Sequence, residues 1–274
     1  MLVNALLAVA VTVAPTAPSA EYELAYSNAV KLEQAQASCM KAAGLQYLPD
    51  NIVKSVRTET ERKALNGDVK AMRQLRAEEG FGIWSEVKEA ETKEHPNDKI
   101  VDSLPAAKLK AYKAAQEQCF VKAVKTVLNK DVSSKEDYEQ QVDLAIAEAE
   151  EELNKDVKLA KLSKSFASCL KIKKAAKPTD VAEAKRKEII EARTDMAEKQ
   201  GVTTSDQQRV TAAGEEELPL PKVSEAQVKP LLKKEIKAAL DDLECGKDFY
   251  AAYEPAAWKL KQKVYAEYGV PFAW

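Results

Sequence analysis

The sequence predicts an all-α fold, an elongated helical bundle with long antiparallel helices, with the further expectation of two similar halves stapled by disulfides. Ala, Lys, Glu, Leu and Gln dominate a chain of 274 residues that has only 8 glycines, and these side chains lose little conformational freedom in a helix. Apolar residues recur at steps of three and four in several long stretches. Widely separated cysteines are the third observation, because they can join such helices to one another.

The first 20 residues predict a secretory signal peptide. They carry no charged side chain, and an apolar run at 5–14 is followed by prolines and by the small residues Ala17, Ser19 and Ala20. This order is typical of a signal peptide with its cleavage site, and the run is short for a membrane span. No Lys or Arg precedes the run, so a membrane anchor or a buried N-terminal helix stays open. No cysteine ends it, so lipid attachment is not expected.

A first helix is expected at 21–43, where apolar residues recur on one side and Gly44 provides a stop. Residues 45–49 should be extended or turning and fold back across this helix. The following segment, 50–59, is ambiguous between a short strand and a loop.

Two short helices are expected at 60–65 and 69–79, the second with Asp68 as its N-cap. Two glycines then interrupt the pattern at 80–84, a segment that also contains Phe, Ile and Trp. Its simplest interpretation is a loop that plugs the core, and the alternative is the lip of a ligand site. A charged stretch follows, and His95 precedes a proline in a predicted loop.

The next helix should begin near Ser103, with Pro105 in its first turn. Further on, Ser134 is followed by Glu and Asp within three residues, which is a capping-box pattern. From there the apolar period predicts one very long helix that passes Leu170 and stops before Pro178.

Another helix is expected at 179–199, closed by Gly201, and the stretch 202–222, with its Ser, Thr, Gly and Pro residues, should be the least ordered part of the chain. The final helix should cover 224–268 with a second capping box at its start. Pro255 lies inside its pattern, so we expect a kink or a break just before it. The apolar stripe of this helix is formed by Leu232, Ile236, Ala239, Leu243, Gly246, Tyr250, Tyr253, Ala257, Leu260 and Val264.

The four cysteines allow three pairings. The spacing from Cys39 to Cys119 nearly equals that from Cys169 to Cys245, and the sequences AQASCMKAA and SFASCLKIK around the first member of each pair are alike. These similarities suggest a duplication and favour the pairs Cys39 with Cys119 and Cys169 with Cys245.

The expected halves are residues 21–132 and 133–274, each with one bridge. Disulfides persist in oxidising compartments, so an even number of cysteines agrees with export. By loop-entropy arguments, each bridge should contribute on the order of 4 kcal/mol to stability.

The segments CMKAAGLQY, SLPAAKLKAYKAAQEQC, ASCL and EIKAALDDLECGKDFYAAYEPAAWKLKQKVYAEY follow one another over most of the chain. In these segments the sequence resembles a group of secreted or lipid-anchored four-cysteine helical proteins of unknown function that is common in actinomycetes. The resemblance implies export and disulfides and carries no catalytic activity. Members frequently have a lipobox cysteine, which is absent here, and Gln118 stands where a Gly often precedes the second cysteine.

Several classes of function lack their residues. A formal net charge of −2 with both signs interspersed offers no basic field for nucleic acid. The single histidine, His95, allows no His-rich metal site, and no nucleophile motif accompanies it. The cysteines are too far apart for a zinc or thioredoxin motif. We therefore expect no catalytic residue, metal or cofactor.

The sequence favours an exported, non-enzymatic helical protein of the cell envelope or medium that binds an unknown protein or envelope component, without a stable membrane span after signal removal. The alternatives are a carboxylate-dependent hydrolase and an intracellular coiled-coil scaffold with free thiols. Aromatic residues gather towards residue 274, and the expected partner contacts are Trp258, Tyr265, Tyr268, Phe272 and Trp274.

Overall fold

A computed structural model describes residues 18–85, 97–172, 177–202 and 221–274, and all regular secondary structure in these ranges is helical. The predicted all-α class is confirmed. Three predictions lie outside the described residues: most of the signal peptide, the charged stretch before His95 together with that loop, and most of the segment 202–222.

The described helices follow the predicted order, with one short helix added. Residues 50–58, within the stretch that the sequence left ambiguous, form a loop. A one-turn helix at 98–102 is added, and the helix expected from Ser103 begins instead at Ala106, with Pro105 as its N-cap. The helices are α1 (Ala20–Ala42), α2 (Glu59–Leu65), α3 (Val69–Glu79), α5 (Asp98–Asp102), α6 (Ala106–Leu128), α7 (Lys135–Asn154), α8 (Val157–Leu170), α9 (Pro178–Lys199) and α10 (Glu225–Tyr268).

The predicted helix caps are present. The Asp68 side chain accepts a hydrogen bond from the Ala71 amide at the start of α3, and Ser134 accepts one from the Asp137 amide at the start of α7. At the start of α10, Ser224 forms the predicted capping box with its Gln partner three residues on. These side chains satisfy amide groups that have no partner inside the helix, which explains why the caps could be recognised from local sequence.

The prediction of one very long helix that reaches Leu170 is wrong. The helix ends at Asn154, and a second helix begins at Val157, so this stretch forms α7 and α8. The side chain of Asp156 accepts hydrogen bonds from the amides of Lys158 and Leu159, so it caps a new helix in the middle of the apolar pattern. Pro178 also has another role than expected: it occupies the first turn of α9, where its missing N–H costs nothing.

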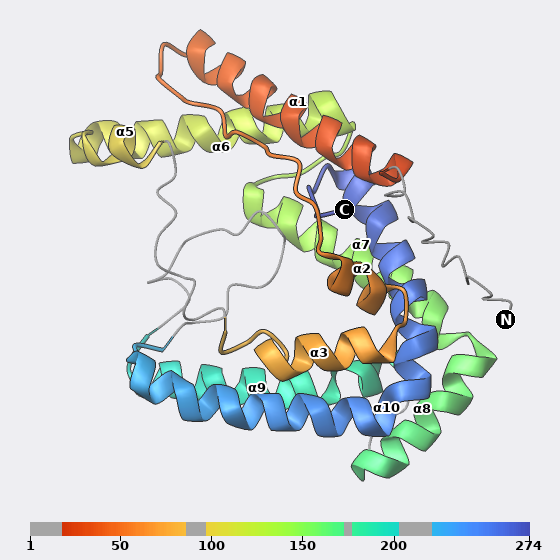
Figure 1. Ribbon diagram of the computed structural model, residues 1–274. Coiled ribbons are helices and arrows are strands. Elements are labelled where there is room, and N and C mark those ends of the chain that lie inside the picture. Colours follow the sequence, from red (N-terminus) through yellow and green to blue (C-terminus); the bar gives the residue numbers. More distant parts are fainter. Residues whose placement is uncertain (1–17, 86–96, 173–176, 203–220) are drawn as a thin grey trace, which may run out of the picture.

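Helix α10 is the element against which most of the others pack. Antiparallel neighbours on its different faces include α3, α7 and α8, and Figure 1 shows its first part lying beside α3 and α9 while its second part rises towards α1. Seven members of the predicted apolar stripe are buried, and Leu232, Ile236 and Leu260 are half-buried. The stripe prediction therefore identified the packed side of this helix.

Helix α8 packs closely on α10 at Gly246. A Cβ atom at this position would lie 2.7 Å from the Cζ atom of Phe166 and 2.9 Å from a ring carbon of Tyr250. The adjacent residue, Cys245, is bonded to Cys169 of α8, with the two Cα atoms 5.6 Å apart. Because Gly246 has no side chain, α8 approaches α10 closely enough for the disulfide to form and for the Phe166 ring to lie directly on the α10 backbone.

Pro255 bends α10 without breaking it. The helix is continuous from Glu225 to Tyr268, and Figure 1 shows that its lighter and darker blue parts run in different directions. Pro255 has no N–H to offer the carbonyl of Ala251. Gly67, at φ 88°, lies against that carbonyl, and a Cβ atom there would overlap the Ala251 oxygen. The α2–α3 turn therefore packs directly on the bend.

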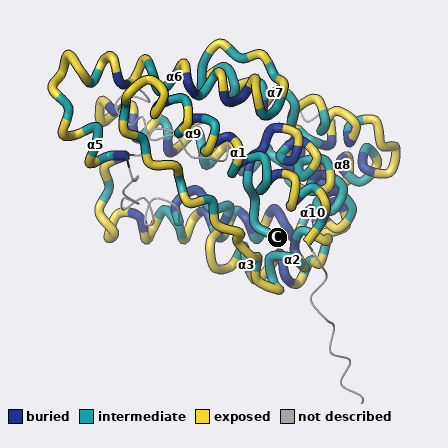
Figure 2. The backbone as a smooth tube through the Cα atoms, turned by 90° about the horizontal axis from the view of Figure 1, so that it is seen from above, coloured by how far each residue is buried: buried dark blue, intermediate teal, exposed yellow. Residues whose placement is uncertain are grey.

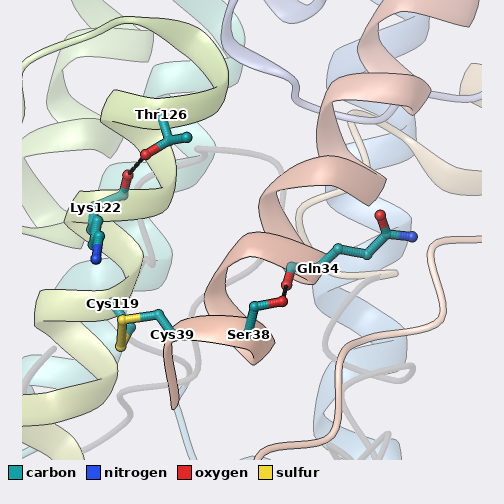
Figure 3. Close-up of a disulfide and its surroundings, with 6 residues drawn as sticks. All are labelled: Gln34, Ser38, Cys39, Cys119, Lys122 and Thr126. Atoms are coloured by element: carbon teal, nitrogen blue, oxygen red, sulfur yellow. Dashed lines mark hydrogen bonds between the residues drawn. A yellow bond between two sulfur atoms is a disulfide. The ribbon is translucent and has the colours of Figure 1, made fainter. Parts of the chain in front are cut away.

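Helices α1 and α6 form an antiparallel pair that is held by the disulfide between Cys39 and Cys119. Leu32 of α1 packs with Val124 of α6, whereas Met40, two turns later, packs with Tyr112. Cys39 and Cys119 are joined with their Cα atoms 5.5 Å apart, and Figure 3 shows the bridge crossing between the two helices. Both cysteine pairings favoured by the sequence are present, with separations of 80 and 76 residues.

Packing crosses the boundary between the two expected halves. Ala64 of α2 and Met72 of α3 belong to the same buried cluster as Phe166, Leu243 and Tyr253. Figure 2 shows the buried residues, in dark blue, where the helices meet, and exposed residues along the outer turns. Residues 59–79 of the first half thus help to form the main core of the second. The duplication itself stays a prediction.

In the described part of the chain, no helix combines the length and the apolar character that crossing a membrane requires.

We predict that Gly67→Ala will destabilise the protein more than Gly201→Ala does. Both glycines have positive φ, so both substitutions strain the backbone, but only at Gly67 would the new Cβ atom meet another segment. The control should cost about 1 kcal/mol, and Gly67→Ala about 2 kcal/mol or more. Urea unfolding followed by circular dichroism measures both, and equal losses would contradict the proposed packing at Ala251.

Candidate interaction surface

Five aromatic side chains gather where the chain returns from the end of α10. We call this set the aromatic cluster: Tyr22, Trp258, Tyr265, Phe272 and Trp274. The Phe272 ring is central, since its centroid lies 5.4 Å from Trp258, 5.8 Å from Tyr265 and 5.6 Å from Tyr22. Trp274 lies 6.5 Å from Tyr22. Such edge and tilted arrangements are favourable for aromatic pairs.

The end of α10 directs the chain into this cluster. Gly269, at φ 68°, adopts the left-handed conformation that ends the helix, and the Val270 amide donates to the Tyr265 carbonyl. A Cβ atom on Gly269 would lie 2.9 Å from the Cβ atom of Asn28, so α1 leaves no room for a larger residue. Residues 270–274 therefore turn back beside α1 and α10.

The segment between α1 and α2, residues 43–58, is named the connector and supplies the remaining groups. Arg57 places its guanidinium 4.7 Å from the Trp258 ring centroid, and its Nε donates to the Ala273 carbonyl at 3.0 Å. Burial lowers the pKa of Arg57 below its usual value. Arg62 of α2 lies 5.9 Å from the Trp274 ring. Both contacts are cation–π interactions, which are strongest where water is partly excluded.

Side chains hold the rest of the connector on α1, α6 and the chain before α5. Asn97, which is almost fully buried, exchanges two hydrogen bonds of 2.8 Å with the Leu48 backbone. Tyr112 donates to the Gln46 carbonyl, and Tyr22 donates to the Ser55 carbonyl at 3.2 Å. Because the connector forms no helix or sheet, these side chains satisfy several of its backbone groups.

The structure brings together four of the five residues predicted as partner contacts. Trp258, Tyr265, Phe272 and Trp274 are half-buried members of the aromatic cluster. Tyr268 is separate and buried, with the Lys130 ammonium 3.7 Å from its ring centroid, while the Tyr138 hydroxyl donates to its carbonyl. Phe272 and Trp274, two of the expected partner contacts, are partly covered by the chain itself.

Sequence reasoning missed Tyr22 and Arg57 as members of this surface. Tyr22 lies in the first turn of α1, and Arg57 lies in the connector, which the sequence left ambiguous. Their neighbours in the cluster are more than 200 positions away in the sequence, and no local period marks such contacts.

The loop 80–84 encloses a fully buried carboxylate from α10. Glu235 accepts hydrogen bonds of 2.8 to 2.9 Å from the amides of Phe81, Ile83 and Trp84. The buried Arg193 of α9 donates to the Ile83 carbonyl at 2.9 Å. Ile83 and Trp84 are themselves buried, so the prediction that this loop plugs the core is confirmed. Glu235 holds the loop against α10 through these hydrogen bonds and, being fully buried, is not accessible to a substrate.

A second buried carboxylate, Asp242, joins α3 to α10. Its Oδ2 atom accepts hydrogen bonds from Arg76 at 2.6 Å and from the Tyr250 hydroxyl at 2.7 Å. The Arg76 guanidinium also lies 4.4 Å from the Tyr250 ring centroid. Burial raises the pKa of Asp242, opposed by Arg76 and Tyr250, and burial raises the pKa of Tyr250 well above its usual value. These groups stabilise the helix contact, so neither buried carboxylate supports the alternative of a hydrolase.

The comparisons with known proteins give no match: no family model fits the chain, and neither curated proteins nor solved structures show similarity to it. Within the described ranges, no three His, Cys, Asp or Glu side chains gather in a way that could hold a metal ion.

We predict that the stability contributed by Asp242 declines as the pH rises. Because its pKa in the folded state is above the ordinary value of 3.8, the folded chain keeps this proton to higher pH than the unfolded chain does. The contribution is therefore fully present below pH 3.8 and is lost as the pH rises through the folded-state value.

The measurement is the unfolding free energy of the wild type minus that of Asp242→Asn, determined from pH 3.5 to 7 by urea titration at about half-unit steps. Taking the difference removes the contribution of other buried groups, such as Glu254, whose pKa is also raised by burial. Asp241→Asn, which removes an exposed carboxylate at the adjacent position, is the matched control. A difference that increases with pH would contradict the prediction.

Proposed function

We propose that this chain is an exported, non-enzymatic helical protein of the cell envelope or medium that binds a partner protein or envelope component through the aromatic cluster. The observation that carries the proposal is the half-buried set of rings around Phe272, flanked by Arg57 and Arg62. Trp, Tyr and Arg are the residues that most often contribute large binding energies at protein interfaces.

Export is supported by the two disulfides. All four cysteines are paired, in the pairs that would staple helices of an exported domain, and such bonds persist in oxidising compartments. The alternative of an intracellular scaffold requires free thiols, whereas the four cysteines lie in two pairs at bonding distance. The uncharged sequence of residues 1–20 supports the same location.

The arrangement of the rings supports a binding role. Trp258 and Tyr265 lie seven residues apart on α10, on the same side of the helix, and both remain partly accessible. Each is held by ring contacts, so a partner would meet side chains that are already ordered and would lose little conformational entropy. Rigid aromatic anchors of this kind suit a recognition surface.

The export part predicts that protein recovered from the culture medium or envelope of the producing cell lacks residues 1–20 and contains both bridges. Non-reducing mass spectrometry with proteolytic mapping should find Cys39 joined to Cys119 and Cys169 joined to Cys245. Retention of the full chain in the cytoplasm with reduced thiols would overturn this part of the proposal.

For the binding part, the full-length chain serves as bait for partners from the same medium and envelope fractions. Trp258→Ala should weaken capture of its specific partner about tenfold or more, as expected for a central aromatic anchor. The matched control is Val157→Ala, which changes a side chain that is 84% exposed at the start of α8. Equal capture by the wild type and Trp258→Ala, with unchanged thermal stability, would contradict the assignment of this surface.

A further inference from the structure

Residues 270–274 lie against the rest of the protein as a bound peptide would. The Trp274 amide donates to the Ser55 carbonyl at 3.1 Å, and the Arg57 amide donates to the Trp274 carbonyl at 2.5 Å. One residue bonded to the two neighbours of Val56 is the pattern of a parallel strand pair. The connector thus offers the edge of an extended chain, to which residue 274 adds.

Two aromatic side chains of this segment act as anchors. Phe272 and Trp274 are two positions apart, so an extended backbone directs both to the same side, and both reach Tyr22, at 5.6 and 6.5 Å. Phe272 is further enclosed by Trp258 and Tyr265. Main-chain hydrogen bonds together with alternate side-chain anchors are how protein domains bind extended peptides.

We propose that Tyr22, Ser55, Arg57, Trp258 and Tyr265 form a binding site for an extended peptide segment with two aromatic side chains at alternate positions. Residues 271–274 occupy this site in the free protein, and the corresponding segment of the partner replaces them in the complex. This inference rests on the proposed function, because it specifies that Tyr22, Trp258 and Tyr265 of the aromatic cluster meet the partner once Phe272 and Trp274 have left the site.

Val270 marks the point up to which the chain stays attached when residues 271–274 are displaced. Val270 is buried in a cluster with Val142, Val264 and Tyr268, so it anchors the chain to α7 and α10. Beyond it, residues 271–274 are all half-buried. Displacement therefore breaks the contacts around Phe272 and Trp274 and leaves the helical packing beneath Val270 in place.

An attached segment competes strongly with a free one. A short flexible tether gives an intramolecular ligand an effective concentration in the millimolar range. A partner peptide consequently binds the wild type weakly unless it offers more contacts than the chain's own segment. If residues 271–274 bind the site less tightly, a free peptide should bind with the affinity that the empty site has for it.

The experiment uses the full-length double variant Phe272→Ala/Trp274→Ala, in which the tethered segment keeps its backbone and loses both anchors. The probe is a fluorescent, N-acetylated peptide with the sequence GVPFAW of residues 269–274, and binding is measured by anisotropy. We expect one peptide to bind per chain and the wild type to bind at least about tenfold more weakly, because its own segment competes.

Two controls make the binding specific to the site. The peptide GVPAAA, which lacks both anchors, should not bind the double variant. Tyr22→Ala added to the double variant should reduce GVPFAW binding about tenfold or more, because Tyr22 contacts both anchors.

Three results would overturn the inference: no binding of GVPFAW to the double variant, equal binding to the wild type, or loss of cooperative thermal unfolding in the double variant. The last would show that residues 271–274 belong to the core and cannot be displaced. If GVPFAW fails to bind while Trp258→Ala still loses the partner, this inference fails and the proposed function stands. If GVPFAW binds while Trp258→Ala keeps the partner, the site exists and the proposed function fails.

Discussion

The close contact between α8 and α10 at Gly246 is the constraint on which the rest of the fold depends. A residue without a side chain lets the Phe166 ring lie on the backbone of α10, and the Cys169–Cys245 bond holds the two helices at that distance. Phe166 also contacts Phe249 and Tyr250. With α8 fixed in this position, the other neighbours of α10 pack on the remaining surface of this 44-residue helix.

Buried polar groups add direction to this apolar packing. Apolar contacts tolerate some sliding and rotation, but a carboxylate that must meet several donors does not. Glu235 sets the loop 80–84 relative to α10, and Asp242 sets α3 through Arg76. Two turns of one helix thereby fix the positions of two consecutive segments of chain. The Arg57 guanidinium has a similar role at the far end, between Trp258 and the Ala273 carbonyl.

The features that could be predicted from the sequence are those that depend on residues close together in the chain or on a simple period. The apolar stripe of α10 and the caps at Asp68 and Ser134 are of this kind. The cysteine pairs are long-range, with separations of 80 and 76 residues, and were favoured because the two spacings are nearly equal. Glu235 and Asp242 could not be recognised, since a carboxylate beside an apolar stripe usually faces solvent and only the opposing loop or arginine makes its burial favourable. Asp156 was missed for a different reason: it occupies one position in an otherwise continuous helical period, and its capping hydrogen bonds outweigh the period there.

The bend of α10 at Pro255 has a consequence for how the chain can vary in length. Cys245 and Trp258 lie on opposite sides of the bend but on one uninterrupted helix, so their rotational phase about the axis is fixed. One inserted residue between them would turn the second part by about 100° relative to the first. The disulfide and the aromatic cluster could then not both keep their neighbours. A change in the length of the stretch from Cys245 to Trp258 would therefore disrupt one of these two sets of contacts.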